Sequence, residues 1–203
     1  DMLGPIQGRR IIDVGTGTGR GAFLLAAAGA RVTGIDASEE MLAIARERAR
    51  ETHAAVDFQV GDAHDIGFPD RAFDIAVSLR VLMHTPRWRP CIGELWRVAS
   101  HAVTLDYPSA RSTALLESIG RKLLHPIGMS SEPYRVFLDG QVRGELQRHG
   151  FRVVAIHRQF VLPIAVHKAI GSRAFTEASE RWLARIGALW FLGSPVTVYA
   201  ERG

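Results

Sequence analysis

The sequence predicts an α/β protein with an open, mostly parallel sheet and helices on both faces. Two observations carry this prediction: strand-like and helix-like stretches alternate over residues 1–108, and the glycine-rich turn "DVGTGTG" follows the first strand-like stretch. Such alternation favours parallel strands, because the chain must cross over through a helix between them. With 203 residues, 47% of them apolar, the chain is long enough to bury the core of one domain.

Seven stretches have the composition of strands, with β-branched and aromatic residues bounded by glycine, proline or polar residues. Five of them fall within the first 108 residues and two lie near the carboxyl end. In chain order they are residues 9–14, 31–36, 55–62, 72–78, 101–108, 152–162 and 194–202.

The helices between these strands are marked by their composition and by residues that start or end helices. Ser38, followed by Glu39 and Glu40, is typical of a helix start, and Gly29 and Gly150 are typical helix ends. The expected helices cover residues 21–30, 39–50, 87–99, 109–128, 138–150 and most of 164–190.

Composition limits the compartment and the partners. The single cysteine, Cys91, excludes a disulfide framework, and the opening "DMLGPIQGRR" lacks the pattern of a signal peptide, so we expect a cytoplasmic protein. The longest apolar stretch is too short for a transmembrane segment. Because the sequence starts at Asp1, about ten residues before the first strand, we expect that it is trimmed or incomplete.

Charge is unevenly distributed: residues 1–106 carry a net charge of −2 and residues 107–203 a net charge of +6. A basic second half would suit an acidic substrate, a nucleic acid or an anionic membrane surface. An ordinary solvated surface in an arginine-rich chain explains the charge more simply. No cluster of basic residues with interleaved aromatic residues points to nucleic acid.

The glycine-rich turn lies where an open α/β sheet holds an adenosine-containing ligand. One register, Gly17, Gly19 and Ala22, has the spacing of a dinucleotide site. In the other register Asp13 stands two residues before the first glycine, where a carboxylate suits a positively charged ligand and repels a pyrophosphate. Asp36, at the end of the second strand, would accept hydrogen bonds from ribose hydroxyls in either case, and a helix N-terminal acid is its alternative reading.

The segments "DVGTGTG", "GIDASEEML", "GDAHDIGFPDRAFDIAV" and "RVLMH" occur in this order over about the first 106 residues. In order and spacing they resemble class I S-adenosylmethionine-dependent methyltransferases, of the group found in ubiquinone and menaquinone biosynthesis. The resemblance implies a Rossmann-like seven-stranded sheet whose last strand is antiparallel. It also implies S-adenosyl-L-methionine as the cofactor and no metal.

The resemblance also assigns roles to residues between the first and fourth strands. Asp13 would lie near the amino acid end of the cofactor, and Asp36 would hold the ribose. Asp62 would accept from the adenine amino group while the Ala63 amide donates to a ring nitrogen, and Ser78 would border the methionine portion. The full cofactor-binding set is Asp13, Gly15, Thr16, Gly17, Asp36, Ala37, Asp62, Ala63 and Ser78.

The acceptor side requires less chemistry, because the sulfonium already activates the methyl group and the protein mainly aligns the acceptor and excludes water. A base is needed only if the acceptor loses a proton. The candidates are His84, Asp106 and Tyr107, which follow the fourth and fifth strands, and Arg80 is available for an acidic group. A structural histidine and a turn before Pro108 are the alternatives.

Two features argue against DNA bases as acceptors, without excluding RNA. Pro90 and Cys91 resemble the nucleophilic pair of cytosine-5 methyltransferases, but they lie early in an expected helix, so we expect Cys91 to be a buried small hydrophobic residue. The tetrad of amino methyltransferases that act on nucleic-acid bases is absent after "DIAVS".

These observations together favour a methyltransferase that acts on oxygen or carbon of a small, apolar or acidic acceptor. We expect one domain over residues 1–203, with a cofactor-binding half (1–108) and a specificity half (109–203) that carries helical insertions. Apolar faces in the insertions fit a substrate cap, a core helix or peripheral membrane contact. The alternatives are an NAD(P)-dependent oxidoreductase, for which two lysines offer little hydride-transfer apparatus, and a non-catalytic cofactor-binding scaffold.

Overall fold

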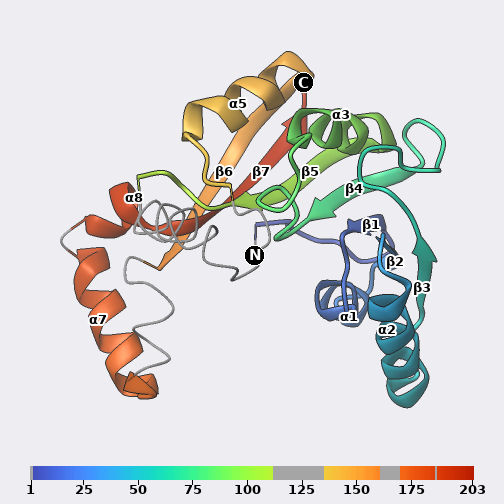
Figure 1. Cartoon of the computed structure of the whole chain (residues 1–203), viewed down its shortest axis with the longest axis horizontal. Helices are drawn as coiled ribbons and strands as arrows, with labels where there is room; N and C mark the ends of the chain where they lie inside the picture. The colour runs from blue at the N-terminus through green and yellow to red at the C-terminus, as the bar shows by residue number, and fades with distance from the viewer. Residues whose placement is uncertain (1, 112–134, 161–169, 186) are drawn as a thin grey trace, which may run out of the picture.

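The computed structural model describes residues 2–111, 135–160, 170–185 and 187–203. Seven strands form one sheet in the order β3-β2-β1-β4-β5-β7-β6 (Figure 1). They are β1 (Arg10–Val14), β2 (Arg31–Asp36), β3 (Val56–Val60), β4 (Phe73–Ser78), β5 (Ala99–Tyr107), β6 (Phe151–Phe160) and β7 (Ser194–Arg202). Strands β1 to β5 pair in parallel, whereas β7 is antiparallel to both β5 and β6. The predicted fold class is confirmed, including the antiparallel last strand.

The described helices are α1 (Arg20–Ala27), α2 (Glu39–Thr52), α3 (Trp88–Val98), α5 (Asp139–Arg148), α7 (Arg173–Arg185) and α8 (Ala188–Leu192). Ser38 caps α2 as predicted, since its hydroxyl accepts a hydrogen bond from the Met41 amide at 3.3 Å. Gly29 and Gly150 adopt positive φ angles just after α1 and α5, which confirms them as helix ends. The helix expected over residues 109–128 falls almost entirely outside the described residues, as does the start of the one expected over 164–190.

Several predicted boundaries were wrong by a few residues. Strand β5 begins at Ala99 rather than at residue 101, directly after the last residue of α3. Ala99 of β5 lies opposite Phe73 of β4, so the pairing between the two strands begins before the apolar residues from which β5 was predicted. The helix expected over residues 21–30 ends earlier, at Ala27.

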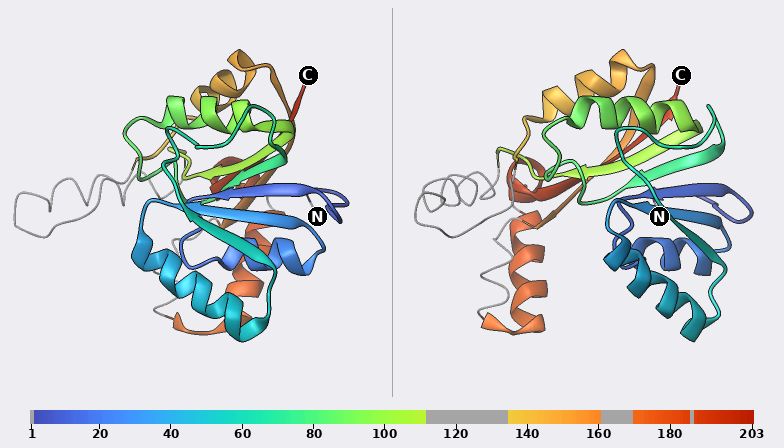
Figure 2. Two further views of the ribbon diagram at one scale, coloured as in Figure 1. Left: turned by 90° about the vertical axis from the view of Figure 1, so that its right-hand side faces the viewer. Right: turned by 45° about the vertical axis from the view of Figure 1, so that its right-hand side comes forward.

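Helices cover the sheet on both faces (Figure 2). Helices α3 and α5 pack on one face, where Trp88, Ile92 and Leu95 of α3 are almost fully buried. Helices α1 and α2 pack on the other face. Adjacent residues Ile11 and Ile12 of β1 are both 0% exposed and belong to the two opposite core clusters. A central parallel strand buried on both sides accounts for the continuous apolar run that predicted it.

Helices α7 and α8 come from the segment between β6 and β7 and lie at the opposite end of the sheet from α2 (Figure 1). Within the described parts of the chain, no helix combines the length and the apolar character needed to cross a membrane. The carboxyl ends of β1, β2, β4 and β5 share one edge, because these strands are parallel, and the predicted site residues follow them there.

Candidate functional site

The glycine-rich turn connects β1 to α1. Gly15, Gly17 and Gly19 have φ angles of 74°, 55° and 80°, a region that side chains disfavour. A Cβ atom on Gly15 would lie 2.1 Å from Cγ2 of Val81, whereas nothing lies within 4 Å of the corresponding position on Gly17. The turn is therefore closed by the loop after β4 at Gly15 and open at Gly17, where a ligand can approach the backbone.

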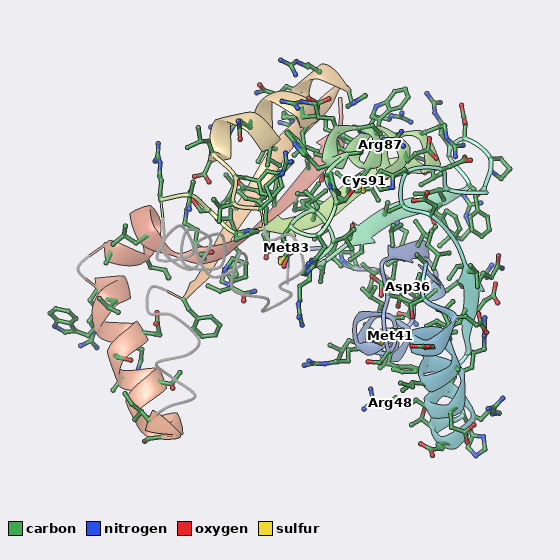
Figure 3. The ribbon with its side chains drawn as sticks, in the orientation of Figure 1. Asp36, Met41, Arg48, Met83, Arg87 and Cys91 are labelled. Carbon is green, nitrogen blue, oxygen red and sulfur yellow. The ribbon has the colours of Figure 1, made fainter. Side chains whose placement is uncertain are left out.

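The carboxylate of Asp36 joins this turn to the start of α2. Its Oδ2 accepts a hydrogen bond from the Gly17 amide at 2.8 Å, and its Oδ1 accepts one from the Ser38 amide at 2.9 Å. A carboxylate has about four acceptor positions, so roughly two remain for hydroxyl groups of a ligand. Figure 3 shows Asp36 beside α1 and α2. The structure thus brings Asp36 and the open part of the turn together.

Asp13 is buried at the glycine-rich turn, and its place near the amino acid end of a cofactor stays a prediction. Its side chain is only 4% exposed, and Oδ2 accepts a hydrogen bond from the Thr16 hydroxyl at 2.7 Å. Burial raises the pKa of Asp13 to about 6, against the opposing effects of the hydrogen bonds from Thr16 and from the Ala22 amide. The side chain of Asp13, bonded to the Thr16 hydroxyl and the Ala22 amide, therefore ties the turn to the start of α1.

Asp62 lies in the loop after β3 and is exposed. Its Oδ1 accepts from the His64 backbone amide at 2.8 Å and lies 2.7 Å from His64 Nδ1, and these hydrogen bonds lower the pKa of Asp62. The other ring nitrogen, His64 Nε2, lies 2.5 Å from the hydroxyl of Thr85. This chain of contacts links the loop after β3 to the loop after β4. Sequence reasoning missed His64 and Thr85, because the contact spans 21 residues and only the proximity of His64 to Asp62 hinted at it.

The three remaining predicted cofactor residues differ in exposure. Ala37 is exposed and Ala63 is half-buried against the core beneath α3. Ser78 is 0% exposed, and its hydroxyl has no hydrogen-bond partner among the described residues. A buried hydroxyl without a partner costs about 1–3 kcal/mol. That Ser78 borders the methionine portion of a cofactor stays a prediction.

Asp106 organises the loop after β4. It is 5% exposed, and its Oδ1 accepts a hydrogen bond of 2.5 Å from the backbone amide of Arg80, which adopts a positive φ of 64°. Burial raises the pKa of Asp106, and the Arg80 amide partly opposes this shift. The Arg80 side chain is exposed in the same loop. Asp106 therefore stabilises an otherwise unfavourable turn, which is a positioning role.

Tyr107 does not lie with the other acceptor-side candidates. It is 2% exposed on the α3/α5 side of the sheet, with its ring 5.9 Å from that of Phe137. Burial raises the pKa of Tyr107 well above its usual range, with further contributions from the charge and hydrogen bond of Asp139. Such a phenol is a poor base at neutral pH. Tyr107 therefore packs in the core on the face of the sheet opposite to Asp106, because consecutive residues of a strand point to opposite faces, and its role as a base stays a prediction.

His84 and Cys91 complete the predicted set. His84 is exposed in the loop after β4, where its amide donates to the carbonyl of Val81 at 2.9 Å, and Figure 3 shows the adjacent Met83 in this loop. Cys91 is fully buried in α3, and burial raises its pKa to about 12, which confirms the prediction of a small core residue.

Comparison with known proteins identifies relatives of the first half of the chain. A family model described as a methyltransferase domain matches residues 12–103. The ubiquinone biosynthesis O-methyltransferase of Paramagnetospirillum magneticum is 38% identical over 85 residues, which cover 42% of this chain and 34% of the relative. The demethylmenaquinone methyltransferase of Thermus thermophilus is 38% identical over 105 residues, covering 49% of this chain and 48% of the relative. The chain thus spans between a third and a half of the length of these relatives.

Solved structures extend the similarity to nearly the whole chain. The magnesium protoporphyrin IX methyltransferase of Synechocystis with bound SAH has a TM-score of 0.69 at 21% identity, covering 99% of this chain and 77% of that one. A methyltransferase from Mesorhizobium loti has a TM-score of 0.71 at 22% identity, covering 99% and 94%. The [4+2]-cyclase SpnF has a TM-score of 0.68 at 24% identity, covering 97% and 76%. At these identities the similarity shows the fold alone, and a cyclase shares it.

Proposed function

Through residues 12–103 the chain belongs to the class I S-adenosylmethionine-dependent methyltransferases, and we propose that it transfers the methyl group of this cofactor to a small acceptor. The attacking atom is an oxygen or a carbon of an apolar or acidic molecule. Residues 1–108 form the cofactor half and residues 109–203 the acceptor half of one domain.

The observation that carries this proposal is the hydrogen bond from the Gly17 amide to Asp36 beside an open backbone. A dinucleotide would need free amides in this turn for its pyrophosphate. Here the Gly17 amide is already occupied, and by a carboxylate that would repel phosphate. The same carboxylate suits the ribose hydroxyls of a ligand that carries positive charge. The arrangement therefore favours S-adenosylmethionine over NAD(P).

The residues around the turn fit this cofactor. Asp36 retains acceptor positions for the ribose, and Asp62 is exposed with its Oδ1 held by His64, which leaves Oδ2 for the adenine amino group. The open side of Gly17 accommodates the methionine portion. When bound, the cofactor supplies a methyl group that its sulfonium has already activated. The chain then has to align the acceptor and exclude water, which in favourable cases accounts for roughly 7–11 kcal/mol of the barrier.

On the acceptor side, the loop after β4 supplies the groups that can face the methyl group. His84 is exposed there, and its imidazole can take a proton from an acceptor or orient it. Arg80 offers a cation to an acidic acceptor, and Asp106 fixes the turn from which Arg80 projects. Relatives named for ubiquinone biosynthesis and for demethylmenaquinone support a small molecule as the acceptor.

Calorimetric titration of the purified protein with S-adenosylmethionine, S-adenosylhomocysteine and NADH tests the proposal. We expect saturable binding of the two sulfur compounds, and binding weakened about tenfold or more in Asp36→Ala, because a charge-assisted contact is lost. Asp57→Ala is the matched control, since Asp57 is an exposed carboxylate on β3, the strand beside β2. Binding of NADH alone would replace the proposal with the oxidoreductase. Binding of the sulfur compounds without turnover of any acceptor would favour the scaffold.

A further inference from the structure

A cavity of about 670 Å³ lies on the acceptor half, apart from the glycine turn and Asp36. Its described walls come from the residues after β5, the start of α5, the end of β6 and the region of α8. They include Arg111, Arg143, Arg158, Asp139, Ile156 and Leu189. The cavity is of the size that small organic ligands occupy, and its walls combine cations with apolar groups.

One acidic residue of the cavity is already neutralised. The carboxylate of Asp139 forms an ion pair with Arg158, and both side chains are nearly buried, at 13% and 12% exposed. Asp139 also accepts a hydrogen bond from the Ser109 hydroxyl at 3.1 Å and contacts Tyr107. A buried carboxylate with several donors around it is part of the wall rather than a free charge. Asp139 and Arg158 therefore add no net charge to the cavity.

Two cations in the cavity are not neutralised in this way. Arg111 and Arg143 are exposed, and neither has an acidic partner within the described ranges. His157 lines the same cavity. Arginine favours carboxylate and phosphate groups, because its planar guanidinium can donate two parallel hydrogen bonds. Together with Ile156 and Leu189, these side chains suit a molecule that has an acidic group and an apolar body.

The sheet register relates the cavity to the acceptor side of the proposed active site. Asp106 of β5 lies opposite Thr197 of β7, and Thr197 lies opposite His157 of β6. Asp106 and His157 are therefore at the same level, two strand spacings or roughly 10 Å apart. A molecule that extends along this edge of the sheet can place one end near the loop after β4 and the other in the cavity.

We propose that this cavity binds the acidic group, a carboxylate or a phosphate, of the methyl acceptor, with Arg111 and Arg143 as the binding residues. This inference rests on the proposed methyl transfer for its acceptor role. It specifies the substrate class: an acidic molecule with an apolar body that is long enough to reach from the loop after β4 to the cavity.

Titration of the full chain with sodium octanoate, n-octyl phosphate and the uncharged n-octanol tests the cavity. We expect the two anions to bind saturably and octanol to bind at least about tenfold more weakly. In Arg111→Gln/Arg143→Gln, binding of the anions should fall by about tenfold or more, because each arginine contributes a charge-assisted hydrogen bond. Binding of only one anion supports the proposal and identifies the acidic group as a carboxylate or a phosphate.

The matched control is Arg148→Gln/Arg152→Gln. Arg148 lies on α5, like Arg143, and Arg152 lies on β6; their side chains are 70% and 78% exposed and do not line the cavity. Equal weakening in this control would overturn the proposal, since net charge alone would then explain the binding. Equal affinity for octanol, or no saturable binding of either anion, would overturn it as well.

Titration with S-adenosylhomocysteine separates this inference from the proposed function. We expect wild type and Arg111→Gln/Arg143→Gln to bind it equally, because both arginines lie outside the glycine-turn site. If wild type binds octanoate but no S-adenosylhomocysteine, the methyltransferase proposal fails while the anion site stands. If S-adenosylhomocysteine binds and the anions do not, only the cavity proposal fails.

Discussion

The proposed cofactor site and the proposed acceptor site of this protein are held together by different kinds of contact. On the cofactor side, two backbone amides donate to the carboxylate of Asp36: that of Ser38, two residues away, and that of Gly17, 19 residues away. On the acceptor side, side chains meet side chains: Asp139 contacts Arg158 and Ser109 across 19 and 30 residues. Every residue of a turn except proline offers a backbone amide, so the motifs around Gly17 and Asp36 can specify the first site, whereas the second depends on which side chains meet when distant segments pack. The predictions below test this contrast, from the largest expected effect to the smallest.

The strongest effect is expected from the buried ion pair on the acceptor side. Asp139→Ala leaves Arg158 without its carboxylate at 12% exposure, and breaking a buried pair from one side costs about 3–5 kcal/mol. The free energy of unfolding, measured in urea, should fall by this amount. The control Asp70→Ala removes an exposed ion pair with Arg97, since the Asp70 side chain is 76% exposed. We expect the free energy of unfolding to fall by about 1 kcal/mol or less. Equal losses of unfolding free energy in the two variants would contradict the expectation that the buried Asp139–Arg158 pair matters more than an exposed pair.

The glycine turn provides the corresponding test on the cofactor side. Gly15→Ala combines a positive φ with a contact of 2.1 Å to Val81, so we expect a loss of about 2–4 kcal/mol in unfolding free energy. Gly17→Ala has a positive φ but open space, so about 1–2 kcal/mol is expected. Urea unfolding separates the two.

Ligand binding should separate the two glycines further. Gly17→Ala places a methyl group on the open side of the turn, where we propose that the cofactor binds. We therefore expect the loss in binding free energy of S-adenosylhomocysteine to exceed the loss in unfolding free energy. A Gly17→Ala protein with unchanged binding would mean that the open side of Gly17 does not face the ligand.

The pH dependence of stability tests the burial of Asp13. Burial raises the pKa of Asp13 to about 6 in the folded state, so the folded protein binds its proton more tightly than the unfolded chain does. The contribution of Asp13 to stability is thus full below the unfolded pKa, near 4, and is lost as the pH rises through about 6, a fall of about 2–3 kcal/mol. In Asp13→Asn this fall should disappear, while the Thr16 hydroxyl keeps an acceptor. Asp57→Asn, an exposed carboxylate, should retain the wild-type slope.

Sequence patterns predicted most of the fold because its elements depend on local chemistry. Ser38 marks a helix start through its hydroxyl, which accepts from the Met41 amide, and Gly29 marks a helix end through its positive φ angle. Apolar runs identified all seven strands. The direction of Tyr107 was predictable as well, since it follows Asp106 in a strand and must face the other side. The environment of Asp13 was not, because its burial depends on how α1 packs over the turn. The pairing of Asp139 with Arg158 depends on tertiary packing and has no local signal.

The smallest effect is expected from the contact between His64 and Thr85, which links the loop after β3 to the loop after β4. Thr85→Val keeps the shape of a side chain that is 7% exposed but removes its hydroxyl, so the loop after β3 loses its link to the loop after β4. We expect about 1 kcal/mol less stability and about fivefold weaker binding of S-adenosylhomocysteine, because Asp62 is then held less firmly. Thr85→Ser keeps the hydroxyl and should restore both. A double-mutant cycle with His64→Ala isolates the contribution of this pair of side chains. If the effects of Thr85→Val and His64→Ala are simply additive, the two loops hold their positions independently. The position of Asp62 would then not depend on the loop after β4.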